Sequence, residues 1–336
     1  MTHSDHSLRS ASPNRYRVGQ QTAATPYPDD AALANIEGAA REFIAEAGAI
    51  VLAGYTRGVP VEYKDKRRSD PVTEIDRAVE SYLTGAVGER FPEQAVLGEE
   101  GQDPTGEHEY EWIVDPVDGT HNFVNGLPLC GVSIGVLHRR RPVVGVLLFP
   151  ALNEELHARR GGGAFRNDEA IHVRQPGELG PSAMGGLSLG FPGAFKTNKA
   201  VQHRFGDSRS LGSMAYEIAT VATGVFDYTI FRGPKIWDVA AGATIVPEAG
   251  GAMLRYSRIR GEWLPVSHFA APPAGVGKER RLRDWGAPTM VATPSAAREL
   301  AANVTPRYPV RSLTAARARA KKLKERRWKG GRKSRG

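Results

Sequence analysis

The order of elements along the sequence predicts a layered α/β or α+β protein. Three observations support this fold class: apolar residues at helical spacing in the first part of the chain, short apolar runs separated by turn residues in the middle, and alternating helical and extended segments after that. Elements of these kinds bury their apolar faces by stacking in layers. The chain has 336 residues, enough for one large α/β unit or about two domains.

Two helices are expected near the start of the chain. Residues 30–55 place apolar side chains at helical spacing, and residues 73–91 repeat this pattern with Thr73 as the N-cap. Residues 61–72, between them, are rich in charge and are expected to form a turn. The polar, proline-punctuated residues 1–29 are expected to be disordered.

The middle of the chain is expected to form antiparallel strands. Short apolar runs separated by turn residues occupy 129–139, 141–151 and 154–162. Residues 161–173 indicate a hairpin that ends in a strand, with its turn at residues 167–168 (Asn-Asp).

Helices return in the C-terminal half. Residues 213–224 and 237–251 have helical patterns, and Gly224 and Gly250 stand where C-terminal caps are expected. Residues 255–288 show little periodicity, so we expect a long surface excursion there.

The excess positive charge lies at the C-terminus. The formal net charge is +8, but residues 311–336 contain twelve Lys and Arg against one acid, Glu325, a balance of +11. The other 310 residues therefore sum to −3, from 33 basic and 36 acidic residues. We interpret residues 303–336 as a basic tail that either binds nucleic acid or an acidic partner, with Trp328 available for stacking on a base, or only solubilises the protein.

The compartment can be inferred from what the sequence lacks. A single cysteine, Cys130, cannot form an intrachain disulfide, and its apolar neighbours indicate a small buried residue. No apolar run reaches the roughly 18–20 residues that cross a bilayer, and the first thirty residues lack the apolar core of a secretory signal. We therefore expect a cytoplasmic protein without a membrane span.

Acidic residues stand at the ends of several predicted elements. Asp115 and Asp118 flank a one-turn corner after a buried strand. Glu99 closes the strand before it, Asp238 begins a helix, and Asp76 lies one turn inside the second helix. Clustered carboxylates without histidine or cysteine suit a hard cation such as Mg²⁺, which prefers oxygen ligands.

Backbone groups of the same corner complete the predicted site. The Val117 carbonyl could act as a further metal ligand, and the Gly119 and Thr120 amides, at a helix N-terminus, could bind a phosphate oxygen. Together these features predict hydrolysis of a phosphate ester by metal-bound water, whereas each aspartate alone also fits an ordinary cap or corner.

Five sequence blocks resemble the inositol monophosphatase family, Mg²⁺-dependent phosphatases related to fructose-1,6-bisphosphatase and to the 3′-phosphonucleotide phosphatases. The blocks are DPVTEID (70–76), GEE (98–100), WIVDPVDGTHNF (112–123), GGGAFRN (161–167) and IWDVAAG (236–242), with a weaker one at 211–228. The resemblance implies a layered α-β-α-β-α sandwich. We expect the phosphatase domain at 30–302, with subdomains at about 30–180 and 181–302, and a homodimer would be usual in the family.

The resemblance also implies roles for the acidic residues. Glu99 and Asp115, with the Val117 carbonyl, would bind a first metal ion, and Asp115, Asp118 and Asp238 a second, with a third, weaker ion near Glu99. The implied catalytic residues are Asp76, Glu99 and Thr120, with Asp76 and the Thr120 hydroxyl orienting the attacking water. The implied substrate-binding residues are Gly119, Thr120, Gly212, Ser213 and Asp238.

The sequence departs from the family at the expected polyol contact. Inositol-specific members carry a glutamate seven residues before the aspartate of WDVAAG, and this chain has Phe231 there. Phe231 would either stack on a ring with Arg232 binding a second phosphate, or simply pack with Arg232 in solvent. We expect Met214 to narrow the pocket and His121 to be exposed and incidental.

Two further lysines bear on the site, and the substrate remains open. Lys64 and Lys66 both lie near the position of a family lysine beside the metals. The expected function is hydrolysis of inositol monophosphate or a related polyol or sugar phosphate. The alternatives are a 3′(2′),5′-bisphosphate nucleotidase, a histidinol phosphatase, or a nucleic-acid-associated binding protein that acts through its basic tail.

Overall fold

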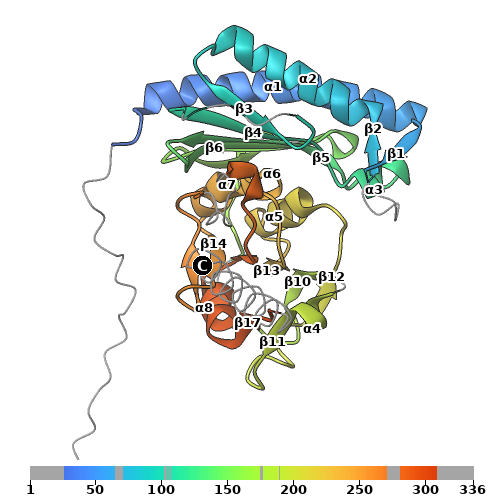
Figure 1. The fold of residues 1–336 in the computed structure, drawn as a ribbon. Helices are drawn as coiled ribbons and strands as arrows, with labels where there is room; N and C mark the ends of the chain where they lie inside the picture. Colours follow the sequence, from blue (N-terminus) through green and yellow to red (C-terminus); the bar gives the residue numbers. More distant parts are fainter. Residues whose placement is uncertain are drawn as a thin grey trace, which may run out of the picture.

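The protein is a stack of helical and sheet layers (Figure 1). The computed structural model describes residues 26–64, 71–101, 104, 106, 108–174, 177–188, 190–270 and 281–308. A helix pair covers a seven-stranded sheet, further helices separate this sheet from a six-stranded one, and helices α4 and α8 lie at the far end. The predicted α-β-α-β-α sandwich is confirmed.

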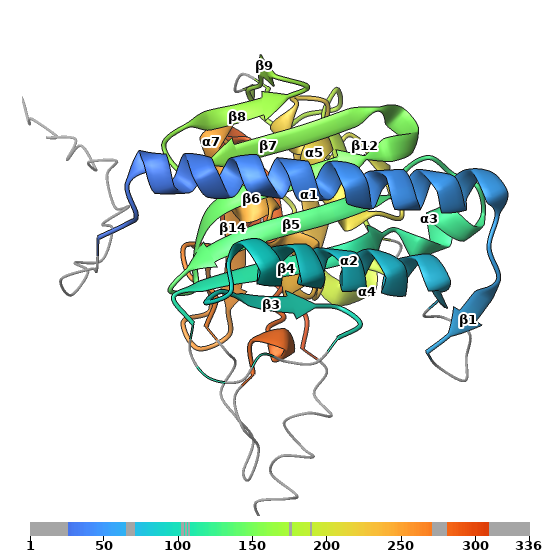
Figure 2. The same ribbon diagram turned by 90° about the horizontal axis from the view of Figure 1, so that it is seen from above.

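The first layer consists of α1 (Asp30–Arg57) and α2 (Glu74–Arg90), which run along one face of the first sheet (Figure 2). Thr73 is the N-cap of α2, as predicted. Its hydroxyl accepts the Ile75 amide at 3.2 Å, which supplies a partner for a backbone group left unpaired at the helix start. A short antiparallel pair, β1 (Val61–Tyr63) with β2 (Pro71–Thr73), flanks the middle of the predicted turn between the helices, and residues 65–70 lie outside the described residues.

The first sheet has the order β3-β4-β5-β6-β7-β8-β9, and only its β3–β4 pair is parallel. Its strands are β3 (Ala95–Gly98), β4 (Tyr110–Asp118), β5 (Gly131–His138), β6 (Arg141–Phe149), β7 (Glu154–Arg159), β8 (Gly163–Arg166) and β9 (Glu169–Ala170), with the 3₁₀ turn η1 (Pro150–Leu152) before β7. The predicted antiparallel strands are confirmed. So is the hairpin turn, because Asn167 and Asp168 have φ of 47° and 66°.

Short helices fill the layer between the sheets: α5 (Met214–Ala222), α6 (Ile236–Val239) and α7 (Gly242–Glu248). The short helix α3 (Thr120–Val124) lies at the end of the first sheet, beside β2 (Figure 1). Gly224 and Gly250 follow α5 and α7 with φ of 74° and 82°, as expected for C-terminal caps. The helix predicted at 237–251 is divided between α6 and α7. The layer packs closely on the first sheet, since a Cβ at Gly145 would lie 2.2 Å from the Ala241 carbonyl oxygen.

The second sheet has the order β12-β10-β13-β16-β14-β15. Its strands are β10 (Met184–Leu187), β12 (Asp207–Arg209), β13 (Tyr228–Phe231), β14 (Ala252–Ser257), β15 (Glu262–Pro265) and β16 (Thr289–Ala292). Beyond it lie α4 (Phe191–Ala194), α8 (Pro294–Asn303) and the antiparallel pair of β11 (Phe195–Thr197) with β17 (Val304–Pro306).

One prediction about the C-terminal half was wrong, and the element bounds there bear on another. Residues 255–288 are not only a surface excursion, because they include β15 and the 3₁₀ turn η2 (Leu282–Asp284), and they bury Phe269 against Trp285. The domain limit at 302 falls inside α8, and β17 continues the fold beyond it. The predicted tail at 311–336, with Trp328, lies outside the described residues, as do residues 1–25.

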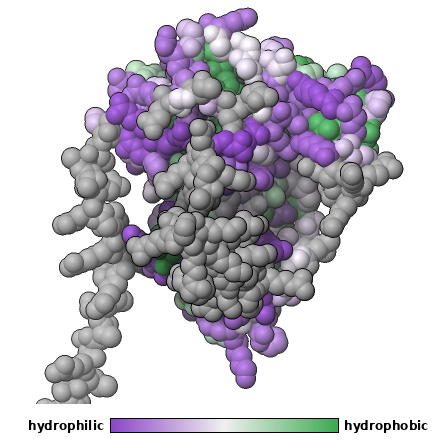
Figure 3. All heavy atoms as spheres, in the orientation of Figure 1, coloured by the Kyte–Doolittle hydropathy of each residue, from purple (hydrophilic) through white to green (hydrophobic). Residues whose placement is uncertain are grey.

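Two surface features complete the fold. Hydrophilic side chains dominate the described part of the face in Figure 3, and apolar ones are scattered over it. Within the ranges that the structure describes, no helix is long and apolar enough to cross a bilayer.

Candidate active site

A bulge at the end of β4 brings Asp115 and Asp118 together. Asp115 pairs with Ser133 of β5 and Asp118 with Gly131, so that two residues of β4 face one of β5. Side chains alternate between faces in a regular strand, and residues three apart would point to opposite sides. The extra residue changes this alternation and directs both carboxylates to the same place.

The corner after the bulge requires glycine. Gly119 has φ of 84°, and a Cβ there would lie 3.0 Å from the Leu129 carbonyl oxygen and from the Ser213 Cβ. The chain turns directly into α3, and the Thr120 hydroxyl donates to the Val117 carbonyl at 3.0 Å. The Val117 carbonyl and the Thr120 side chain therefore face one another inside the corner.

Asp238 joins this pair from the opposite half of the fold. It lies in the first turn of α6, which is held against β5 by a bond from the Ser133 hydroxyl to the Trp237 carbonyl at 3.3 Å. Asp115, Asp118 and Asp238 each offer a carboxylate oxygen, and these oxygens lie within 4.8 Å of one another. The structure thus brings together the three side chains that the resemblance implies as ligands of one metal ion.

The three carboxylates stand in a strongly unfavourable environment for negative charge. Burial raises the pKa of Asp115 well above its usual value, with further increases from Glu99, Asp118 and Asp238. Burial likewise raises the pKa of Asp118, to about 6. Burial, followed by the charge of Asp118, raises the pKa of Asp238. The three carboxylates offer only oxygen ligands and repel one another, and such a group of ligands fits a divalent cation such as Mg²⁺.

Asp118 is also held by the start of α5. The Ala215 amide donates to its Oδ2 at 2.8 Å, the Met214 amide to its Oδ1 at 3.3 Å, and the Ser213 hydroxyl bonds to Oδ2 as well. Ser213 is the N-cap of α5, and Gly212 before it has φ of 80°. The two residues predicted to contact substrate thus lie at the site, where Ser213 positions a carboxylate.

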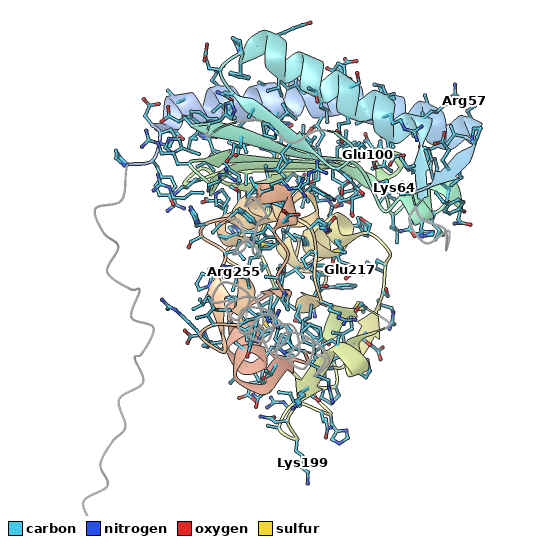
Figure 4. The ribbon with its side chains drawn as sticks, viewed as in Figure 1. Arg57, Lys64, Glu100, Lys199, Glu217 and Arg255 are labelled. Atoms are coloured by element: carbon cyan, nitrogen blue, oxygen red, sulfur yellow. The ribbon has the colours of Figure 1, made fainter. Side chains whose placement is uncertain are left out.

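Glu99 follows β3 and lies on the same cleft as the three aspartates. Lys64 donates to its Oε1 at 2.8 Å and also bonds to Glu100 (Figure 4). Burial alone would lower the pKa of Lys64, but its bonds to Glu100 and Glu99 raise it. Of the two lysines singled out in the sequence, Lys64 reaches the site, and Lys66 lies outside the described residues.

The predicted pair of Asp76 and Thr120 does not form in this structure. Asp76 accepts the Thr73 amide at 2.8 Å and the Thr73 hydroxyl at 2.6 Å, completing a capping box at the start of α2. Thr120 bonds to Val117 instead. Burial first, and the charge of Glu99 among other causes, raise the pKa of Asp76, so it remains electrostatically linked to the site.

These residues line a cleft of about 510 Å³. Its lining comprises Lys64, Glu99, Glu100, Asp115, Val117, Asp118, Gly119, Thr120, His121, Gly212, Met214, Lys235, Trp237 and Asp238. His121 is exposed, as expected, although it belongs to the lining. Phe231 packs in the core, where it is 5% exposed, and Arg232 is exposed at the surface. Neither residue is among those that line the cleft.

Three supporting residues were missed by sequence analysis. Asn122 donates to the carbonyls of Leu129 and Leu211, at 2.7 Å each, and so ties the corner to the second half of the fold. Buried Glu217 accepts the Leu211 amide at 2.9 Å (Figure 4). Their positions inside the blocks at 112–123 and 211–228 were the available signal.

The third missed residue is Arg283, which reaches the site from η2. Its guanidinium donates to the carbonyls of Gly98 and Gly101, at 2.9 and 2.8 Å, on either side of Glu99 and Glu100. It also lies 5.7 Å from the centre of the Trp237 ring. The sequence around Arg283 carried no motif that would have revealed this contact.

Comparison of the sequence with models of known protein families identifies the family of this chain. A model of the inositol monophosphatase family matches residues 32–290. The chain belongs to the inositol monophosphatase family. Membership supports a phosphatase with a metal-binding site, and the family is in general Mg²⁺-dependent.

Individual relatives of the family differ in the function that their names state. The chain is 34% identical over 245 residues to the Nus factor SuhB of Pasteurella multocida, covering 70% of this chain and 90% of the relative. It is 38% identical over 190 residues to a fructose-1,6-bisphosphatase/inositol-1-monophosphatase of Thermotoga maritima, covering 56% and 72%. A solved inositol monophosphatase of Thermotoga maritima superposes with a TM-score of 0.62 at 30% identity, covering 78% of this chain and 93% of that one.

Proposed function

We propose that this chain hydrolyses a small phosphate monoester in a Mg²⁺-dependent reaction, with polyol and sugar phosphates as the substrate class. The observation that carries the proposal is the approach of Asp115, Asp118 and Asp238 to within 4.8 Å. Enclosed carboxylates that repel one another are costly unless a cation neutralises them. The similarity to inositol monophosphatases supports the same activity.

The acidic residues would divide between two or three ions. Glu99, Asp115 and the Val117 carbonyl would hold one, Asp115, Asp118 and Asp238 another, and Glu99 a third. When bound, Mg²⁺ lowers the pKa of a coordinated water and offsets the charge of the phosphate.

The chain itself would position the groups around the phosphate. The Gly119 and Thr120 amides, fixed by the glycine corner, would donate to the phosphoryl oxygens. Ser213, Met214 and Ala215 would hold Asp118 in its ligating orientation.

Asp76 and Thr120 retain separate roles in this proposal. Thr120 lines the cleft and would contact the attacking water. Asp76 caps α2 through its Oδ2, which accepts both the amide and the hydroxyl of Thr73, and its Oδ1 would be the oxygen that turns toward Thr120.

The residues that line the cleft favour certain leaving groups over others. With Phe231 in the core, the position that supplies a polyol-binding glutamate in inositol-specific members contributes no acceptor. Exposed Lys235 lines the cleft instead, beside Met214 and Trp237. A cation at this place favours a leaving group that carries a second phosphate, so sugar bisphosphates and 3′-phosphonucleotides stand beside inositol monophosphate.

A substrate panel tests the proposal. Phosphate release would be measured from myo-inositol 1-phosphate, fructose 1,6-bisphosphate, 3′-phosphoadenosine 5′-phosphate and histidinol phosphate, in Mg²⁺ and in EDTA. We expect turnover only in Mg²⁺ and a loss of about a thousandfold in Asp115→Asn, because the ions supply several kcal/mol of transition-state stabilisation.

A matched variant separates the site from buried charge in general. Glu37→Gln changes another buried carboxylate to its amide on the opposite face of the first sheet, and it should keep Mg²⁺-dependent turnover. Turnover in EDTA, or full activity of Asp115→Asn, would overturn the metal assignment. Turnover of no substrate in any divalent metal would overturn the proposed reaction.

A further inference from the structure

A buried carboxylate of α2 lies behind the turn 98–101, which carries Glu99. Glu80 is 6% exposed, and among the described residues no cation pairs with it. Asp76 and Glu80 are one helical turn apart on α2, so their side chains lie on the same face of the helix. Glu80 accepts the Glu100 amide with its Oε2 at 2.8 Å. The backbone of the turn therefore supplies the partner that this buried carboxylate needs.

Glycine at both ends of the turn makes room for the Glu80 carboxylate. A Cβ on Gly98 would lie 2.2 Å from the Glu80 Cδ, and a Cβ on Gly101 would lie 2.4 Å from its Oε1. Neither glycine is among the described residues with positive φ, so the backbone conformation does not require glycine at these positions. Burial raises the pKa of Glu80, and backbone hydrogen bonds from Glu100 and Gly101 counter this effect. The carboxylate thus lies directly against the backbone of the turn.

Arg283 holds the same turn through its carbonyl groups. Its guanidinium donates to the carbonyls of Gly98 and Gly101, at 2.9 and 2.8 Å. Glu80 accepts an amide of the same four residues. An anionic group on the amides and a cationic group on the carbonyls therefore fix the backbone of the turn from two separate elements, α2 and η2.

We propose that Glu80 is a positioning residue for Mg²⁺ binding, which holds the backbone of the turn 98–101 so that the Glu99 carboxylate faces Asp115. This inference rests on the proposed function. Glu99 and Asp115 line the same cleft, but Lys64 also bonds to the Glu99 carboxylate (Figure 4). A turn that is free to move would let Glu99 follow Lys64, whereas a fixed backbone keeps its carboxylate available to an ion. Residues that orient a metal ligand in this way contribute to metal affinity without touching the metal.

A Mg²⁺ titration of the full-length Glu80→Gln variant, followed by thermal unfolding, tests this role. Glutamine keeps the size of the side chain but offers one acceptor oxygen instead of two. We expect the Mg²⁺ concentration for half-maximal stabilisation to rise about tenfold, as is typical when the partner of a metal ligand is changed. In EDTA, hydrogen exchange of the Glu100 and Gly101 amides should be faster than in the wild type.

Gly101→Ala offers a second route to the same effect without a change of charge. The added Cβ would meet the end of the Glu80 side chain, which is flexible and can move away, so that the fold is kept and the carboxylate is displaced. This variant should also raise the Mg²⁺ midpoint. Combined with Glu80→Gln, it should add little, because both changes remove the same contact.

Glu37→Gln is the matched control for the loss of a buried carboxylate. It makes the same chemical change on the opposite face of the first sheet, where Glu37 lies 2.7 Å from His157 Nδ1. It should lower stability in EDTA and leave the Mg²⁺ midpoint unchanged. An equal rise of the midpoint in Glu37→Gln would show a general effect of lost stability and overturn the positioning role.

The remaining outcomes separate this inference from the proposed function. If Mg²⁺ did not stabilise the wild type, the proposed metal site would fail, and the role of Glu80 with it. If Mg²⁺ stabilised the wild type, and Glu80→Gln and Gly101→Ala kept the wild-type midpoint, only the role of Glu80 would fail. Faster exchange of the turn with an unchanged midpoint would likewise overturn it, because Glu80 would then support the turn without affecting the metal.

Discussion

Buried carboxylates lie on both faces of the first sheet, in opposite electrostatic surroundings. On the α1 face, Glu37 is 5% exposed, lies 2.7 Å from His157 Nδ1 and accepts Arg159 Nη1 at 2.8 Å. Burial by itself would raise its pKa, but the bonds from His157 and Arg159 outweigh burial and lower it. On the cleft face, Asp115 is 2% exposed, and burial and four neighbouring acids raise its pKa.

The difference distinguishes a structural carboxylate from a ligating one. Glu37 finds its counter-charges within the chain, so its charged form stabilises the fold. Lys64 of the cleft bonds to Glu99 and Glu100, and the charge of Lys235 offsets only part of the effects of burial and Asp118 on Asp238. The described cations of the cleft therefore leave Asp115, Asp118 and Asp238 incompletely neutralised, which favours binding of a cation from outside the chain.

The largest expected effect is a contrast in stability measured without metal. Glu37→Gln should lower the free energy of unfolding by about 3 kcal/mol, because it weakens a buried charge-assisted contact to Arg159 and the buried contact to His157. Asp115→Asn should leave that free energy unchanged or raise it, because it removes a repelled buried charge. Urea unfolding in EDTA would measure both variants.

Added Mg²⁺ should reverse the ranking of the two variants. The ion should stabilise the wild type and Glu37→Gln and should stabilise Asp115→Asn much less, since binding to the folded state alone raises its stability. If Asp115→Asn were destabilised in EDTA as much as Glu37→Gln, groups within the chain would already neutralise the charge of the aspartates. The two faces of the sheet would then not differ in the way described.

The pH dependence of the metal-free protein sharpens the same contrast. The pKa of Asp118 is raised from 3.8 to about 6 on folding, so the folded state binds more protons, and the resulting stabilisation is present at low pH and lost as pH rises through about 6. Between pH 5 and 8 we expect a loss on the order of 1 kcal/mol from Asp118 alone. Asp115 and Asp238 act in the same direction.

Glu37 acts with the opposite sign and in another pH range. Its lowered pKa gives a stabilisation that is present above about pH 4.3 and lost below it, outside the range from pH 5 to 8. Urea unfolding across that range should therefore show the same slope in Glu37→Gln as in the wild type, and a smaller slope in Asp118→Asn. Saturating Mg²⁺ should flatten the wild-type slope, and an unchanged slope in Mg²⁺ would contradict binding at these carboxylates.

Features set by neighbouring residues could be predicted from the sequence. The Thr73 cap, the Asn167–Asp168 turn and the glycine caps each depend on a few adjacent residues, and each was predicted correctly. Asp115 and Asp118 lie far from Asp238 in the sequence. Their proximity was nevertheless expected, because the sequence blocks that contain them resemble those of one family. The bulge that aims Asp115 and Asp118 could be anticipated only as a corner, because its register depends on β5.

Contacts made by isolated side chains could not be predicted. Phe269, Leu282 and Trp285 are spread over a stretch without periodicity, and they are buried because other parts of the chain cover them. The expected contact between Asp76 and Thr120 is absent from the structure because a contact with a neighbouring residue replaces it. Thr73 lies three residues before Asp76 at the helix start, so a local capping box takes the carboxylate.

Arg283 offers the finest test of the comparison, since its contacts with backbone carbonyls support the cleft. Its bonds to the Gly98 and Gly101 carbonyls hold the turn that carries Glu99 and Glu100. Arg283→Ala should raise the Mg²⁺ concentration for half-maximal thermal stabilisation a few-fold, because a looser turn orders Glu99 less well. Arg283→Lys should recover part of this effect by donating to the same carbonyls. Arg281→Ala, in the same segment beside Asp284, should change the Mg²⁺ midpoint little. An unchanged midpoint in Arg283→Ala would show that the cleft holds its geometry without this arginine, and that the ions themselves order Glu99.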